Sequence, residues 1–241
     1  MPSSQHYHIS KIIDIILSLQ PFSVLDVGSG FGKYGVLCRE YLELWDGRQE
    51  YKFIRRIDGV EVFENYITPL HKFIYNNIYT ENIIDLVKRL DFTYDLVLLI
   101  DVLEHFSKEE GIWLLNNLLS KNKGILICTP KKPSAQKDAF DNIFETHKSS
   151  WKKAELSRFG KYYFSRDSVS CIIYITKEPN LINILHTRLK ELKMSRNESL
   201  ILHLTSRKRS LIKSTRKKLS SIPLIVKAYR KLKNDLNSFS L

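Results

Sequence analysis

The sequence predicts an α/β fold: a doubly wound, mostly parallel sheet with an antiparallel hairpin at the C-terminal side, followed by a helical C-terminal extension. Three observations support this prediction. Strand-like runs alternate with helix-like segments; a glycine-rich turn follows the first run, at residues 28–32; and the runs at 95–100 and 124–129 are almost continuously apolar. Such runs are typical of parallel strands that are covered by helices on both faces.

The expected elements follow one another along the chain. Apolar residues on one face predict a helix at 9–19, which Pro21 ends. Three strand-and-helix pairs come next, then a buried strand, and finally two runs joined by a polar turn, which predict the hairpin. The pairs are 23–30 with 34–45, 57–63 with 65–77, and 94–103 with 107–121; the later strands are 124–130, 161–164 and 169–176.

Charge divides the chain into two parts. Residues 179–241 hold 15 Lys or Arg and 3 Asp or Glu, whereas residues 1–178 hold 23 of each. We therefore expect a neutral domain at 1–178 and a basic amphipathic helical tail at 179–241. No stretch approaches the roughly 18 uncharged apolar residues of a membrane span. The N-terminus lacks the basic region of a signal peptide, and three separated cysteines suit reduced thiols, so the expected location is the cytoplasm.

The most specific motif is an acid followed by alternate glycines. Asp26 comes near the end of the first expected strand, and Gly28, Gly30 and Gly32 follow it. Glycine lets the backbone turn sharply and approach a ligand closely, and the start of the next helix can present N–H groups to an anionic group. Asp26 can accept a hydrogen bond from a cationic amine. A ligand that carries both an amine and a carboxylate suits this pairing.

A dinucleotide site is the competing interpretation, because residues 30–35 match G-x-G-x-x-G. That fingerprint places its first glycine at the strand end, which here is Gly28. Counted from Gly28, Lys33 stands where the third glycine belongs. We therefore favour a ligand with an amine and a carboxylate over a dinucleotide. Glu61, at the end of the second strand, either caps that strand or bonds a ribose diol. Its place after the second strand of the same unit favours the ribose, a role that both ligand classes share.

Residues 24–32, 59–64, 95–106 and 124–130 resemble the successive motifs of class I S-adenosylmethionine-dependent methyltransferases, in particular bacterial methyltransferase-domain proteins of the ubiquinone-biosynthesis type. The resemblance covers roughly residues 9–176 and implies a Rossmann-like fold, methyltransferase activity and S-adenosylmethionine as the cofactor. The cofactor-binding residues that it implies are Asp26, Gly28 and Gly30 at the methionine part, with Ser29 and Gly32 in the same turn, Glu61 at the ribose, Asn82 at the adenine, and Asp101 with Val102 on the sulfur side. Asn82 stands where the family often has Asp.

Three residues are candidates for a catalytic role. Glu104 and His105 follow the strand at 94–103 and either take a proton from the acceptor or orient the loop; we favour orientation, since methyl transfer depends largely on alignment of the reactants. His147 lies in a Glu-x-His stretch that resembles one over the acceptor side of related pockets. His147 is the best candidate for a base. The alternative, to which we give equal weight, is that His147 is a loop histidine that only bonds the backbone.

No metal site is expected from the sequence. His6 and His8 form a pair without a carboxylate or cysteine at ligand spacing, so we expect them to lie in a flexible terminus.

The acceptor expected is a small molecule or a sugar, including a lipid-linked glycan. For the tail at 179–241 we favour an anionic membrane surface, so that the protein lies peripherally at its inner face. Packing or oligomerisation ranks second, and nucleic acid last, because few aromatic residues are present to stack on bases. The alternatives for the whole chain are an RNA methyltransferase that holds phosphates with its tail and a cofactor-binding module without catalysis. The oligomeric state stays open.

Overall fold

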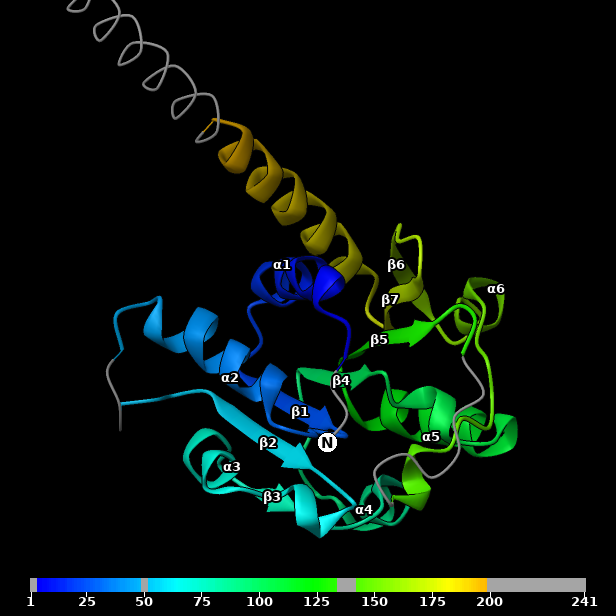
Figure 1. Ribbon diagram of the computed structural model, residues 1–241. Coiled ribbons are helices and arrows are strands. Elements are labelled where there is room, and N and C mark those ends of the chain that lie inside the picture. The colour runs from blue at the N-terminus through cyan, green and yellow to red at the C-terminus, as the bar shows by residue number, and fades with distance from the viewer. Residues whose placement is uncertain (1–3, 49–51, 134–141, 199–241) are drawn as a thin grey trace, which may run out of the picture. The chain divides into compact units, whose positions relative to one another are not determined.

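The computed structural model describes residues 4–48, 52–133 and 142–198. The chain divides into two compact units, Met1–Leu189 and Lys190–Leu241. Within the described part of the first unit, seven strands form one sheet in the order β3-β2-β1-β4-β5-β7-β6 (Figure 1). The strands are β1 (Ser23–Val27), β2 (Arg56–Val60), β3 (Ile78–Tyr79), β4 (Leu96–Ile100), β5 (Gly124–Pro130), β6 (Lys161–Ser165) and β7 (Ser170–Thr176).

The direction of the strands agrees with the sequence. The first five strands pair in parallel, and β7 pairs antiparallel with both β5 and β6. The predicted mostly parallel sheet with an antiparallel C-terminal hairpin is therefore confirmed.

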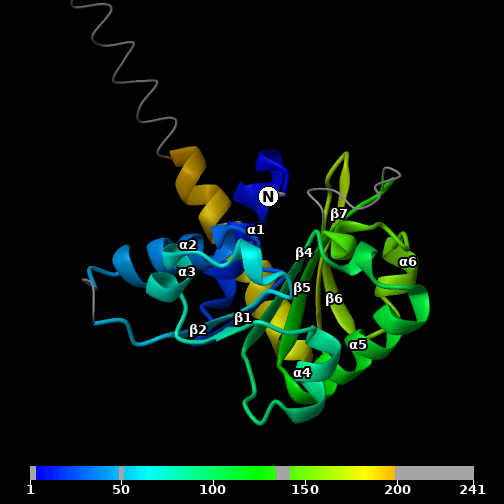
Figure 2. The same cartoon turned by 60° about the horizontal axis from the view of Figure 1, so that its bottom comes forward.

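Helices cover both faces of the sheet (Figures 1 and 2). In β4, Leu98 faces one apolar core and Val97 the other, and both side chains are fully buried. This two-sided burial explains the continuous apolar run in the sequence. On the first face lie α1 (Ile9–Leu19), α2 (Lys33–Arg39) and α3 (Pro69–Ile74), and on the second α4 (Ile83–Arg89), α5 (Lys108–Lys121) and α6 (Lys153–Leu156).

Two of the expected helices are shorter or divided. The segment 34–45 continues from α2 into a π-helix at Glu40–Leu44. The segment 65–77 contains α3, which begins only at Pro69 because proline restricts the residue before it to extended backbone. Thr68 has that conformation, with φ of −124° and ψ of 170°, and proline then fits the first helical turn.

A helix at residues 179–198 follows β7. Leu185 and Leu189 are buried in the core that contains α1, and the Arg188 guanidinium donates a hydrogen bond of 2.8 Å to the carbonyl of Ser18. The compact unit therefore extends to Leu189, beyond the boundary that charge alone predicts. The part of the expected basic amphipathic tail at 199–241 lies outside the described residues. None of the described helices is both long and apolar enough to cross a membrane.

Candidate active site

A cavity of about 480 Å³ opens at the carboxyl ends of β1, β2, β4 and β5. The sheet reverses its strand order between β1 and β4, and ligands of open α/β sheets bind at that point. Most of the residues singled out in the sequence come together here: Gly28, Ser29, Gly30, Glu61, Asn82, Asp101, Val102, Glu104, His105 and His147 line the cavity. Asp26 and Gly32 are not among the described lining residues.

The glycine turn is held by the end of β2. The N–H groups of Gly28 and Ser29 donate to the carbonyl of Val60 at 2.8 and 3.0 Å, and the Gly30 N–H donates to a Glu61 carboxylate oxygen at 2.9 Å. These three donors are satisfied within the chain. The turn is therefore fixed before a ligand arrives, and it does not offer these N–H groups to a pyrophosphate.

Asp26 is buried near the end of β1 and is not among the described lining residues. Its buried carboxylate accepts a hydrogen bond of 2.6 Å from the Tyr75 hydroxyl. Burial raises the pKa of Asp26 to about 7, although the hydrogen bonds from Tyr75 and from the Gly35 backbone oppose the shift. A Cβ at Gly35 would lie 2.4 Å from the Tyr75 ring, so the missing side chain gives Tyr75 its place. The sequence did not single out Tyr75.

His71 also supports the glycine turn, and the sequence did not identify it. Its ring is fully buried, and Nδ1 accepts a hydrogen bond of 3.1 Å from the backbone N–H of Thr68. Nε2 must therefore carry the proton, and it donates to the carbonyl of Gly30 at 2.9 Å. Burial lowers the pKa of His71, which keeps the ring neutral in this arrangement.

Buried carboxyl groups dominate the inner wall of the cavity. Burial raises the pKa of Glu61, and it raises that of Asp101 to about 6, against the opposing charge of Lys33. Burial, together with the charge of Asp101, raises the pKa of Glu104 to about 8. The Lys33 ammonium donates to the Ser4 carbonyl at 2.6 Å. At neutral pH Glu104 is therefore mainly protonated, whereas Asp101, whose pKa lies below 7, keeps a negative charge that favours a cationic ligand over an anionic one.

Asn82 is the N-cap of α4. Its Oδ1 accepts a hydrogen bond of 2.9 Å from the Ile84 N–H, as an N-cap side chain does. One lone pair of this oxygen is thus used by the helix, while the second lone pair and the amide N–H₂ group remain for a ligand.

Glu104, His105 and His147 gather at one end of the cavity. The Thr129 hydroxyl donates to the Glu104 carboxyl at 3.0 Å, and the two imidazole rings lie 5.0 Å apart. The loop that carries His147 is fixed, since the N–H groups of Lys148 and Ser149 donate to the Glu104 carbonyl at 2.8 and 3.0 Å. The ligating atoms of the three side chains lie within 4.8 Å of one another, a set that could hold a metal ion.

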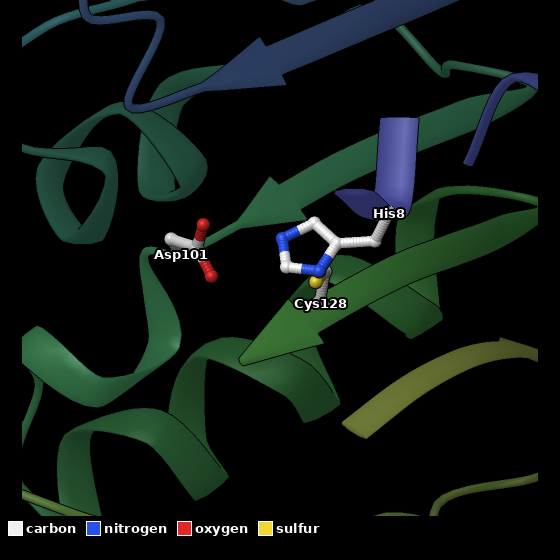
Figure 3. A group of neighbouring side chains, drawn as sticks. All are labelled: His8, Asp101 and Cys128. Atoms are coloured by element: carbon white, nitrogen blue, oxygen red, sulfur yellow. The ribbon is translucent and has the colours of Figure 1, made fainter. Parts of the chain in front are cut away.

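The N-terminal segment differs from the flexible terminus that the sequence predicts. Ser4 and Gln5 line the cavity, and His8 is fully buried, so His8 does not lie in a flexible terminus, whereas His6 is exposed. Asp101 and Cys128 lie close to His8 and offer metal-ligating atoms, although both are far from His8 in the sequence (Figure 3). Cys128 is one of three cysteines that, as predicted, are buried and free.

Known proteins resemble this chain in fold. No family model and no curated protein matches its sequence. An O-methyltransferase family protein from Burkholderia thailandensis matches with a TM-score of 0.50 and 12% identity, over 70% of this chain and 56% of that one. The N-terminal domain of EvdMO1, solved with S-adenosylhomocysteine bound, matches with a TM-score of 0.50 and 14% identity, over 73% of this chain and 83% of that one.

These likenesses confirm the predicted fold, which is that of class I S-adenosylmethionine-dependent methyltransferases. The chain spans little more than half the length of the Burkholderia protein.

Proposed function

We propose that the chain is an S-adenosylmethionine-dependent methyltransferase that acts on a small-molecule or sugar acceptor, including a lipid-linked glycan. One observation carries the proposal of this cofactor: the cavity at the switch point is walled by carboxyl groups, while three N–H groups of the glycine turn are bonded within the chain. S-adenosylmethionine brings a sulfonium and an amine to such a wall, whereas a dinucleotide brings a pyrophosphate.

The lining residues fit this donor group by group. The Ser29 hydroxyl is buried and has no hydrogen-bond partner among the described atoms, so it is available to the donor carboxylate. Glu61 faces the cavity with a carboxylate that can accept from ribose hydroxyls, and the Asn82 amide can donate to the adenine. Asp101 would face the sulfonium side. Asp26, which is bonded to Tyr75 and not among the lining residues, acts as a positioning residue through Tyr75.

When bound, the donor supplies an electrophilic methyl group, and its sulfur takes the electron pair of the broken carbon–sulfur bond. An acceptor that is a hydroxyl must also lose its proton. Because the pKa of Glu104 is raised to about 8, this group is mainly protonated at neutral pH and is a poor base there. The Nδ1 of His105 lies 3.3 Å from the carbonyl of Thr146, a placement that orients this ring. We assign the proton to His147, which lines the cavity on a loop that the Lys148 and Ser149 N–H groups fix to the Glu104 carbonyl.

A transfer assay tests the proposal. The full-length chain is incubated with methyl-labelled donor and separate pools of small sugars, lipid-linked glycans and RNA. We expect label in a sugar or lipid-linked pool, and a loss of about 100-fold or more in His147→Ala, since general bases contribute on that scale. His186→Ala, an exposed histidine outside the cavity lining, is the control. Label in RNA alone, or in no pool, contradicts the proposed acceptor class.

We further propose that residues 179–241 bring the protein to an anionic membrane surface, because this segment holds 15 Lys or Arg against 3 Asp or Glu. Residues 199–241 lie outside the described residues, so the proposal rests on the sequence. The full-length chain should sediment with anionic vesicles at low salt and stay in solution with neutral ones. No sedimentation with anionic vesicles would end this proposal.

A further inference from the structure

The imidazole of His8 has no hydrogen-bond partner among the described atoms, at either Nδ1 or Nε2. His8 ends the short 3-10 helix His6–His8, which precedes α1, and its side chain is fully buried. Buried polar groups are nearly always bonded. This ring therefore indicates a ligand that is not part of the chain.

Two further side chains with metal-binding atoms face this ring. Figure 3 shows the His8 ring directed toward the Asp101 carboxylate, with the Cys128 sulfur beside it, and the ligating atoms of the three lie within 4.8 Å of one another. Asp101 and Cys128 come from neighbouring strands: β4 pairs with β5 up to Ile100 and Cys128, and the Asp101 N–H donates to the Cys128 carbonyl at 2.7 Å. Two of the three groups are thus fixed by the sheet.

The backbone at Asp101 is unusual. Its φ is +54°, a left-handed conformation that residues other than glycine rarely adopt. Such conformations cluster at functional sites, where they aim a side chain. Here the turn ends β4 and leaves the carboxylate between His8 and the cavity, because Asp101 belongs to the cavity lining as well.

We propose that His8, Asp101 and Cys128 bind a divalent transition-metal ion, with Zn²⁺ as the best match. A thiolate, an imidazole and a carboxylate are the donors that zinc takes, whereas Mg²⁺ and Ca²⁺ take oxygen alone. Zinc bonds of about 2.0–2.3 Å in a tetrahedron place ligand atoms roughly 3.5 Å apart, so a small inward movement of the side chains completes the site. Three protein ligands leave the fourth position to water.

The ion would hold the N-terminal segment against the sheet. Ser4 and Gln5, which precede His8, line the cavity, whereas His8 and Cys128 are not among the described lining residues. A metal bound to His8 would therefore hold in place the segment that carries Ser4 and Gln5. The site shares no residue with the group Glu104, His105 and His147, which offers no sulfur; it shares Asp101 with the proposed donor site, but metal binding does not depend on the proposed methyl transfer.

Cobalt substitution tests the site, because Co²⁺ bound to a thiolate shows a charge-transfer band that oxygen and nitrogen ligands do not give. The full-length chain is stripped of metal and titrated with Co²⁺. We expect one equivalent with the thiolate band, and its displacement by Zn²⁺. Cys128→Ser should lose the band, while Cys171→Ser, a buried cysteine outside the cluster, should keep it. His8→Asn should weaken binding about tenfold or more.

Two further measurements keep the test decisive. Zn²⁺ should raise the melting temperature of the wild-type chain, since a ligand stabilises the state that binds it, and should raise it less in His8→Asn, whose folding is checked by circular dichroism. His147→Ala should leave the cobalt band unchanged. No stoichiometric binding, a band that survives Cys128→Ser, or binding without a thiolate band that His147→Ala abolishes would each overturn the proposal.

Discussion

Gly28→Ala tests how the glycine turn is packed. Gly28 has a φ of +67°, and a Cβ there would lie 2.5 Å from Cγ2 of Val102. A left-handed alanine costs about 1–2 kcal/mol, and overpacking costs about 1–3 kcal/mol. The free energy of unfolding should therefore fall by about 2–5 kcal/mol. Urea unfolding followed by tryptophan fluorescence measures the change, because Trp151 is buried.

Gly47→Ala is the matched control. Gly47 has a φ of +77°, but nothing lies within 4 Å of an added Cβ, so only the backbone cost of about 1–2 kcal/mol should appear. The cost of Gly28→Ala should shrink by about 1–3 kcal/mol in a Val102→Ala background, since the contact is then gone. Equal destabilisation by Gly28→Ala and Gly47→Ala, or no recovery with Val102→Ala, would refute the packing of the turn against Val102.

Three other predictions concern the groups around the cavity. Burial raises the pKa of Glu104 from its ordinary value of 4.5 to about 8, so the stability that Glu104 contributes is complete below about pH 4.5 and is lost as the pH rises toward about 8. Glu104→Gln should therefore reduce the fall of the urea midpoint over this pH range. An unchanged fall would exclude Glu104 as its source. Tyr75→Phe leaves the buried Asp26 carboxyl without its side-chain donor and should lower the free energy of unfolding by about 1–3 kcal/mol; full stability would mean that Asp26 has another partner. His147→Ala should lower turnover and leave donor affinity intact, measured by kinetics beside calorimetry, and a loss of affinity without a loss of turnover would reverse its assignment.

The sequence predicts the sheet well because each long strand can be recognised from its own apolar residues. A continuous apolar run such as residues 96–100 shows burial on both faces without reference to the rest of the chain. Short elements leave a weaker trace. The two residues of β3 and the seven of α4 are too few for a recognisable periodicity, and neither element was expected.

The same contrast holds at the site. Gly28 and Glu61 stand in short motifs at strand ends, so the strand order alone brings them to the cavity. Tyr75, His71 and His8 act through contacts with residues far away in the sequence, and no local spacing reveals such contacts. The expectation that His8 lies in a flexible terminus is wrong for this reason: the burial of its side chain depends on the sheet against which it packs.

Calorimetric titration of the full-length chain with S-adenosylmethionine, and with its demethylated product, tests the central claim most directly. The claim predicts saturable binding at one site, weakened about tenfold or more in Asp26→Ala, which removes the buried partner of Tyr75, and in Glu61→Ala, which removes the acceptor of the Gly30 N–H in the cavity lining. Glu109→Ala, an exposed carboxylate outside the cavity lining, should bind like the wild type. No saturable binding by the intact chain, or binding that Glu61→Ala leaves unchanged, would contradict the donor site described above.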